Sequence, residues 1–382
     1  MKIRILAAFT AVILAASCGP KYQQPSDGSN LGFALSFIRN ADESINPDQN
    51  LLVSPYSAGL ALSMLAEGAE GTTRTELDAA LNNCLFKAGD LSSDGGTKVE
   101  SANSVWVSSN FSIRNRYVNL LENDFDAFVD NLIFSDPAAV KEINDWCSEH
   151  TAGKIPSIVD KLDPNTVLVL LNALYFNAPW AEAFDPEHTE MKPFKGKAGI
   201  KDVPMMSRRG KYMYAEYEGC SLVQLPYEGG RYSMYLLLPP LNLAPSTVIS
   251  YMHETAFNTA LSMLDERDVL LTMPKFKIET AMLLNETLKR MGVRTAFTSA
   301  ADFSAISESG PVAVDQVKQK CYMEVGEKGT EAAAVTSVQM RLTSARPSAD
   351  KPVVMEVDRP FIFVIADSVS GNIMFAGKIM NL

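Results

Sequence analysis

Histidine and serine are the residues from which a hydrolytic site is most often built, and this 382-residue chain offers few of the required arrangements. It has only three histidines, His150, His188 and His253, and no Gly-x-Ser-x-Gly turn that would present a serine nucleophile. An imidazole-driven hydrolase therefore has few residues to use. We expect a protein that is not an enzyme.

The glycine pattern at 326–330, Gly-Glu-Lys-Gly-Thr, partly resembles a phosphate-binding loop but lacks the four-residue gap that precedes Gly-Lys-Ser/Thr. The chain also contains no His-Glu-x-x-His, no Gly-x-Gly-x-x-Gly and no paired-carboxylate motif on a recognisable scaffold. Nucleotide binding is unsupported. We expect neither a metal nor a cofactor.

Apart from Cys18, the cysteines are widely spaced and no Cys-x-x-Cys pair occurs; they are Cys84, Cys147, Cys220 and Cys321. This spacing argues against metal and redox motifs. In an exported chain four cysteines could form two disulfides, but buried single thiols fit equally well. The sequence leaves that choice open.

Composition and charge indicate a large globular protein that does not bind nucleic acid. Hydrophobic residues make up 47% of the chain, which is enough to bury a sizeable core. The net charge of -11 disfavours phosphate binding, which needs clustered Lys and Arg. The densest basic run, 208–211, is short, and we expect it to be a solvated turn.

Hydrophobic patterning predicts an α+β protein with one domain over residues 30–382. Ser54-Pro55 is a helix-start signal before an apolar stretch, and Gly68 and Gly71 mark its end. Strand-like runs follow at irregular intervals; they are 104–107, 167–176, 233–238, 269–273, 312–325 and 361–366. No interior linker or repeat divides this region.

The segment 326–340 combines the signals of a loop with those of a strand. Two glycines flank Glu327 and Lys328, which indicates an exposed hinge. From Thr330 onward every second side chain is small or apolar, as an inward strand face requires; the set is Thr330, Ala332, Ala334, Thr336, Val338 and Met340. The same residues could instead open a helix capped by Thr330, because alanine is a good helix former.

The predicted strand before this hinge carries one polar residue on its inward face. Val317, Cys321, Met323 and Val325 share that face with Gln319. A buried amide without partners costs on the order of 1 to 3 kcal/mol. We therefore expect Gln319 to meet Ser54, Ser57 or Asn172, unless it lies near water at a strand end.

The first residues predict export. Lys2 and Arg4 precede an apolar stretch over 5–16, which is too short to span a bilayer. Residues 14–18, Leu-Ala-Ala-Ser-Cys, resemble a bacterial lipoprotein signal, although the aliphatic residue stands four rather than three places before Cys18. We expect a signal peptide over 1–17, lipidation at Cys18 and a polar tether over 18–29, with a plain secretory signal as the alternative.

Ordered motifs across residues 30–382 resemble the serpin family. They are Asn50 to Ser57, Gly68 to Thr73, Asn144 to Trp146, Thr151 to Ile155, Asn172 to Trp180, Leu271 to Phe276, Leu288 to Gly292, Glu327 to Ala334, Asp358 to Phe363 and Gly377 to Ile379. Each motif alone is weak, and their common order makes the resemblance specific.

The resemblance implies three β-sheets, about nine helices and an exposed reactive-centre loop. It also implies a suicide-substrate mechanism, in which a serine protease, or as a second class a cysteine protease, cuts the loop and is trapped as the acyl-enzyme when the loop inserts into the main sheet. The alternative is a non-inhibitory serpin that acts as a carrier or chaperone. Such members commonly carry proline, charge or bulk in the hinge, and the inward positions of this hinge, Thr330, Ala332 and Ala334, have none.

The family's way of counting from Glu327 places the reactive bond between Thr343 and Ser344. A small residue there implies a target with a shallow or apolar pocket, elastase-like or subtilisin-like. Arg341 and Arg346 are alternatives that a trypsin-like protease could use. The loop is longer than usual on its C-terminal side, over 344–352, which weakens the count.

The resemblance also assigns roles to two further groups of residues. The hinge comprises Glu327, Gly329, Thr330, Glu331, Ala332, Ala333 and Ala334, and the sheet-opening region comprises Ser54, Ser57, Asn172, Trp180 and Gln319. Many serpins have histidine where this chain has Gln319, and glutamine can still donate and accept a hydrogen bond. The expected partner is a target protease, with membrane contact only through the lipid anchor. We expect a monomer, lipid-anchored to a bacterial membrane or cell surface, or secreted.

Overall fold

The computed structural model describes residues 30–88, 96–163, 166–307, 312–330 and 351–382 of the chain. The side chains of 100–102 and 172–175 are outside this description. Residues 331–350, where the reactive loop is expected, and the N-terminal residues 1–29 also lie outside it.

Eight α-helices and two short 3₁₀ turns occur in the described part of the chain. The α-helices are α1 Leu31–Glu43, α2 Pro55–Gly68, α3 Gly71–Ala80, α4 Asn115–Phe125, α5 Pro137–Glu149, α6 Pro245–Ser250, α7 Glu254–Ser262 and α8 Asn285–Arg290. The 3₁₀ turns are η2 Pro186–His188 and η3 Thr295–Phe297.

The sequence explains the central helix α2 directly. Ser54 caps it by accepting a hydrogen bond from the backbone N–H of Ser57, and Pro55 occupies the first turn. All of its residues except Glu67 are buried, which matches its apolar composition. Because α2 packs against a sheet, its position determines which strand Ser54 and Ser57 can contact.

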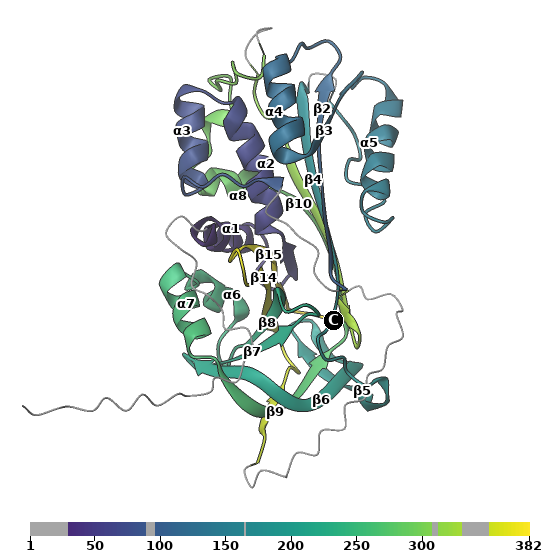
Figure 1. The fold of residues 1–382 in the computed structure, drawn as a ribbon, viewed down its shortest axis with the longest axis vertical. Coiled ribbons are helices and arrows are strands. Elements are labelled where there is room, and N and C mark those ends of the chain that lie inside the picture. Colours follow the sequence, from purple (N-terminus) through teal and green to yellow (C-terminus); the bar gives the residue numbers. More distant parts are fainter. Residues whose placement is uncertain (1–29, 89–95, 164–165, 308–311, 331–350) are drawn as a thin grey trace, which may run out of the picture.

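The smaller sheet has six strands in the order β10-β11-β12-β4-β2-β3. Their bounds are β2 Lys98–Ser108, β3 Ala127–Leu132, β4 Leu168–Pro179, β10 Phe276–Leu283, β11 Val317–Gly326 and β12 Gly329–Thr330. Figure 1 shows α5 on one face of this sheet and α2 and α4 on the other. We call it the main sheet.

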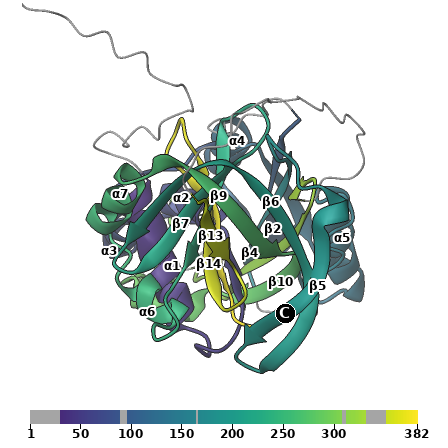
Figure 2. The ribbon, with the colours of Figure 1, turned by 90° about the horizontal axis from the view of Figure 1, so that it is seen from below.

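The larger sheet has nine strands in the order β1-β15-β14-β8-β7-β6-β9-β13, with β5 paired to β6. The bounds are β1 Leu51–Val53, β5 Thr189–Gly196, β6 Gly199–Tyr217, β7 Cys220–Pro226, β8 Tyr232–Leu238, β9 Asp265–Pro274, β13 Val353–Glu356, β14 Phe361–Asp367 and β15 Ile373–Ile379. Seen from below, α1, α6 and α7 lie along one side of it (Figure 2). Strands β14 and β15 are buried along their whole length.

The α+β class is confirmed, and the details of the sheets differ from expectation. The described strands form two hydrogen-bonded sheets rather than three, because the 19-residue β6 pairs with β5, β7 and β9 and so joins two strand groups. Eight α-helices are seen where about nine were expected, in a chain with gaps in its description.

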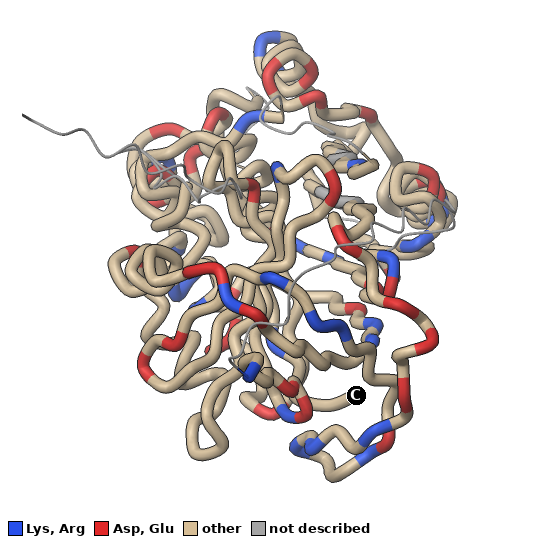
Figure 3. The backbone as a smooth tube through the Cα atoms, turned by 60° about the horizontal axis from the view of Figure 1, so that its bottom comes forward, with Lys and Arg blue, Asp and Glu red and all other residues tan. Residues whose placement is uncertain are grey.

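Two local predictions were wrong. The basic run 208–211 lies inside strand β6 and is not a turn, since Arg208 and Arg209 pair with Leu271 and Leu270 of β9. Figure 3 shows acidic and basic positions interspersed along the described elements. The predicted strand 312–325 begins only at Val317. The residues before it do not join the sheet, because the backbone N–H of Val314 instead donates to the carbonyl oxygen of Ala296.

Candidate functional site

The hinge enters the main sheet immediately after β11. The chain turns at Glu327 and Lys328 and returns as the two-residue strand β12, antiparallel to both β11 and β4. Thr330 pairs with Val325 on one side and Ala178 on the other. The strand interpretation of Thr330 is therefore the one that the structure shows, rather than the helix cap.

Gly329 is required at this entry. Its φ is +147°, a conformation that side chains other than glycine rarely adopt. A Cβ here would lie 2.1 Å from the carbonyl oxygen of Ala178. The close approach of β12 to β4 thus depends on the absence of a side chain.

Glu327 fixes the turn by three interactions with other elements. Its carboxylate is 2.8 Å from the ammonium group of Lys275 and accepts a 3.0 Å hydrogen bond from the hydroxyl of Thr189. Its carbonyl oxygen accepts from the backbone N–H of Phe184 at 2.8 Å. Burial alone would raise the pKa of Glu327, but the bonds from Lys275 and Thr189 outweigh it and leave the pKa lowered.

Trp180 lies beside the turn and binds its backbone. The indole N–H donates to the carbonyl oxygen of Gly326 at 2.9 Å, and the backbone N–H of Trp180 donates to the carbonyl oxygen of Lys328 at 2.9 Å. The indole also stacks on Tyr227, with ring centroids 4.5 Å apart and planes 11° from parallel. Trp180 therefore packs at the point where the loop enters, as expected.

Tyr227 is a residue of this site that the sequence analysis missed. Its hydroxyl and that of Thr330 are 2.6 Å apart, and both side chains are buried. Burial raises the pKa of Tyr227, so the phenol stays neutral. Tyr227 follows β7 and meets Trp180 through an isolated bridge, a long-range contact that no local pattern signals.

A latch near the N-terminal end of β11 is formed by Gln319. Its side-chain oxygen accepts from the backbone N–H of Ser54 at 3.0 Å, and its amide nitrogen donates to the carbonyl oxygen of Ser54 at 2.8 Å and to the hydroxyl of Ser57 at 3.4 Å. Gln319 is only 4% exposed, so the alternative of a residue near water was wrong. The backbone of Asn172 lies opposite Gln319 in the parallel pairing of β11 with β4.

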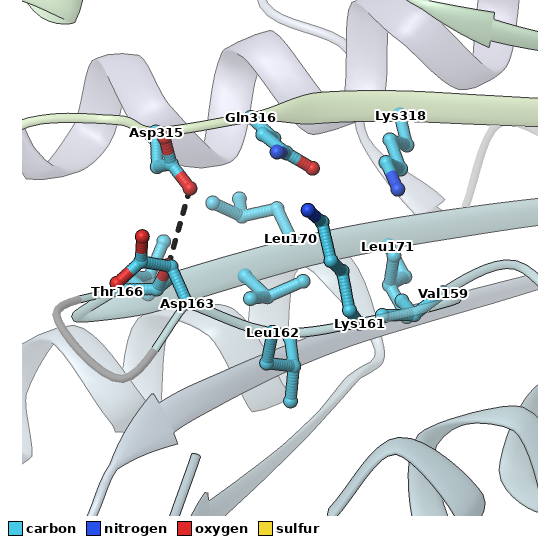
Figure 4. Close-up of a pocket in the computed structure, with 12 residues that line it drawn as sticks. Val159, Lys161, Leu162, Asp163, Thr166, Leu170, Leu171, Asp315, Gln316 and Lys318 are labelled. Atoms are coloured by element: carbon cyan, nitrogen blue, oxygen red, sulfur yellow. Dashed lines mark hydrogen bonds between the residues drawn. The ribbon is translucent and has the colours of Figure 1, made fainter. Parts of the chain in front are cut away.

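From this latch to the end of the sheet away from the hinge, β4 and β11 are paired directly with each other. Val317, Lys318 and Gln319 pair with Leu170, Leu171 and Asn172. Figure 4 shows the small cavity at this end, where the hydroxyl of Thr166 donates to Asp315 at 3.1 Å and Lys161 extends toward Gln316. The cavity of about 20 Å³ has room for roughly one water molecule.

Between the hinge and the latch, β4 and β11 are separated. In the described residues their pairing ends at Gln319 and Asn172, and the strands are next joined only through β12 at Thr330. We call this interval, 173–177 of β4 and 320–324 of β11, the seam. The inward residues of β11 are buried as predicted, and burial raises the pKa of the Cys321 thiol among them to about 12.

The structure brings together Ser54, Ser57 and Gln319 at the latch, and Glu327, Gly329, Thr330 and Trp180 at the hinge. The remaining predicted residues lie outside the description; they are Cys18, Glu331, Ala332, Ala333, Ala334, Arg341, Thr343, Ser344 and Arg346. The side chain of Asn172 is likewise outside it.

Other kinds of site find little support in the described ranges. Among these residues no group of three or more His, Cys, Asp or Glu is placed to hold a metal ion. The cysteines left open by the sequence, Cys84, Cys147, Cys220 and Cys321, are thiols rather than disulfides. No described helix has the length and apolar character needed to cross a membrane.

Comparisons with known proteins agree with this geometry. Residues 28–382 match the family described as Serpin (serine protease inhibitor). An uncharacterized serpin-like protein of Thermococcus kodakarensis is 34% identical, covering 87% of this chain and 81% of its own. The native structure of the thermophilic serpin tengpin superposes with a TM-score of 0.84 at 29% identity, covering 92% and 93% of the two chains. Human thyroxine-binding globulin, solved with thyroxine, has a TM-score of 0.82 at 28% identity, covering 92% and 97%.

Proposed function

The chain belongs to the serpin family, and we propose that it is an irreversible suicide-substrate inhibitor of serine proteases. Cysteine proteases are a second class to be tested. The observation that carries the proposal is β12: the first residues of the reactive loop already form a strand between β4 and β11, directly above the seam.

The pairing register supports insertion of the rest of the loop. Because β12 is antiparallel to both neighbours, each further loop residue would meet one residue earlier on β4 and on β11. From Thr330, this count takes residues 331–335 through the seam and brings Thr336 opposite both Asn172 and Gln319. Asn172 and Gln319 already pair with each other in the uncut protein. The register of the loop counted along β4 therefore agrees with its register counted along β11.

The same register supports the predicted inward face of the loop. Thr330 shares the buried face of Val325, and the next inward residues would follow Met323, Cys321 and Gln319. These positions correspond to Ala332, Ala334 and Thr336, which are small enough to slide past their neighbours. Insertion beyond Thr336 requires that the direct pairs between β4 and β11, Val317 to Gln319 with Leu170 to Asn172, separate.

In the proposed reaction, the protease nucleophile attacks the carbonyl carbon of Thr343. The peptide bond to Ser344 breaks, the new amine leaves with the C-terminal fragment, and Thr343 stays bound to the enzyme as an acyl group. Insertion of roughly 14 residues at about 3.3 Å each would then move the protease some 45 Å. Distortion of the protease before deacylation makes the trap irreversible.

The target class follows from the cut position. Cleavage after Thr343 favours an elastase-like or subtilisin-like protease, whereas cleavage after Arg341 or Arg346 would indicate a trypsin-like one. The second candidate function is that of a carrier or chaperone. The structural similarity to thyroxine-binding globulin, which was solved with bound thyroxine, supports this second candidate.

A protease panel tests the proposal. The intact chain is incubated with elastase, subtilisin, trypsin and a cysteine protease, followed by denaturing electrophoresis and mass determination of the released C-terminal peptide. An inhibitor gives an adduct that survives denaturation and a peptide that begins at Ser344, and the cut protein melts at a much higher temperature than the intact one. A carrier or chaperone gives no stable adduct and no such rise.

We also propose that the chain is exported and held by lipid on Cys18, or secreted. Support comes from the apolar stretch over 5–16 and the small residues before Cys18. Mass analysis of the N-terminal peptide from membrane fractions, compared with a Cys18→Ala variant, tests lipidation. Release of the parent protein into the medium at the same level as the variant would contradict the anchor.

A further inference from the structure

A second surface, on the opposite face of the main sheet from α2, is lined by aromatic rings from three elements. They are Trp106 of β2, Phe128 of β3 and Trp146 of α5. The ring centroids of Trp106 lie 5.3 Å from Phe128 and 6.1 Å from Trp146, and those of Phe128 and Trp146 are 6.0 Å apart. Phe128 is 43% exposed, which is high for a residue of this size and polarity.

These rings form the floor of an open depression. Its volume is about 420 Å³, within the range of small-molecule sites. The remaining lining comes from the outer side of α5, namely Ala138, Lys141, Glu142, Asp145 and Glu149. The floor is rigid because Trp106 is 1% exposed and its indole N–H donates to the hydroxyl of Ser104 at 2.9 Å.

The rim of the depression is negatively charged. Lys141 forms an ion pair with Asp145, which neutralises one of the three carboxylates. Glu142 and Glu149 remain on the same side of α5, two helical turns apart. Within the described residues neither forms an ion pair, so they present uncompensated charge beside the aromatic faces.

We propose that this depression binds a small organic cation of the alkylammonium class. An ammonium group above an aromatic ring is attracted by the negative face of the ring, and the methyl groups around its nitrogen cover apolar surface at the same time. Glu142 and Glu149 supply the counter-charge. A neutral ligand of the same shape would gain only the apolar contact, and an anion would be repelled by the rim.

Choline and its neutral isostere 3,3-dimethylbutan-1-ol test the proposal with the full chain and no protease. Binding is followed by calorimetry and by tryptophan fluorescence at pH 8. Saturable choline binding at least tenfold tighter than that of the isostere is expected. Equal affinities, or no saturable choline signal, would overturn the cation site.

Variants separate the rim from general charge effects. Glu142→Gln with Glu149→Gln should weaken choline binding at least fivefold, and so should Phe128→Ala. The matched pair Glu122→Gln with Glu187→Gln removes the same charge at exposed positions elsewhere and should leave binding unchanged. Equal weakening by both pairs would mean that only net charge matters and would contradict the proposal. Since no protease is present, these outcomes are independent of the inhibitory function.

Discussion

Gln319 bonds both main-chain groups of Ser54, accepting from its N–H at 3.0 Å and donating to its carbonyl oxygen at 2.8 Å. A single side chain thus ties β11 to the residue that caps α2. Because Ser54 is fully buried, nothing in solution can replace Gln319 as its partner.

Gln319→Met should destabilise the intact protein by about 2 kcal/mol or more, since it keeps the volume of the side chain and leaves the buried polar groups of Ser54 without it. Calorimetric melting measures the effect. The control is Gln49→Met at an exposed position, for which a change within about 0.5 kcal/mol is expected. A Gln319→Met protein as stable as the parent would show that the latch contributes nothing.

The hydroxyl pair of Tyr227 and Thr330 should show a coupling of about 1 kcal/mol in a double-mutant cycle of Tyr227→Phe and Thr330→Val. Each single change leaves the other buried hydroxyl without this partner, so the double variant should lose less stability than the two single losses combined. Strict additivity would mean that the 2.6 Å contact has no energetic role.

If the proposed inhibition is correct, Ala332→Arg should convert the protein into a substrate that is still cleaved but no longer traps the protease. On the proposed insertion, the register would place residue 332 inward, opposite Met323, which is 1% exposed, and an arginine cannot be buried there without a partner. Thr330→Arg should do the same and should also destabilise the intact protein, because Thr330 is already buried.

The matched control for these changes is Glu331→Arg, one residue from Ala332 on the outward side of the same register. It should keep most of the inhibition. The moles of inhibitor consumed per mole of enzyme blocked, measured by titration, distinguish the variants. Inhibition by Ala332→Arg equal to that of the parent would rule out insertion as the mechanism.

Acid should loosen the hinge. The pKa of Glu327 is lowered from its ordinary 4.5, so its ionised form is favoured by the fold. This contribution is complete above about pH 4.5 and is lost as the pH falls through the lowered pKa of the folded state. The protection of the hinge amides, taken as the intrinsic exchange rate at each pH divided by the measured rate, should therefore fall between pH 5 and pH 3 more in the parent than in Glu327→Gln, which has already lost the charge. An identical pH response of the two proteins would contradict this assignment.

The buried thiols should react slowly. Burial raises the pKa of Cys147 to about 11 and that of Cys321 to about 12, so at pH 8 both remain protonated and poorly nucleophilic. Iodoacetamide should label these two only as the pH approaches those values or after denaturation. Mass spectrometry of the labelled peptides measures this, and rapid labelling of Cys321 at pH 8 would mean that the seam opens readily in the intact protein.

Local signals in the sequence were sufficient for much of the fold. Ser54-Pro55 predicted the start of α2, and the alternation along 317–325 predicted the buried face of β11, because both depend on neighbouring residues alone. The partners of Gln319 could be proposed because a buried amide must be satisfied and few polar residues share its surroundings.

Features that depend on distant elements could not be found in this way. Tyr227 reaches Thr330 only because β7 ends beside the hinge, and Lys275 meets Glu327 from the junction of β9 and β10. The merging of the strands into two sheets depends on β6 pairing along its full length, for which periodicity gives no register. The basic run was misplaced for the same reason, since strand pairing overrode its charged composition.

The two residues of β12 have a kinetic consequence. A loop that starts a new strand inside a sheet must first bear the entropic cost of bringing its end between the neighbouring strands. A loop that only lengthens an existing strand does not bear that cost. In this protein β12 already forms the first two residues of that strand. The strand can therefore lengthen residue by residue from Thr330 until it reaches the direct β4–β11 pairs at Gln319. In the proposed mechanism, the competition between trapping and release of the protease is then decided at the far end of the sheet, well away from the bond that is cut.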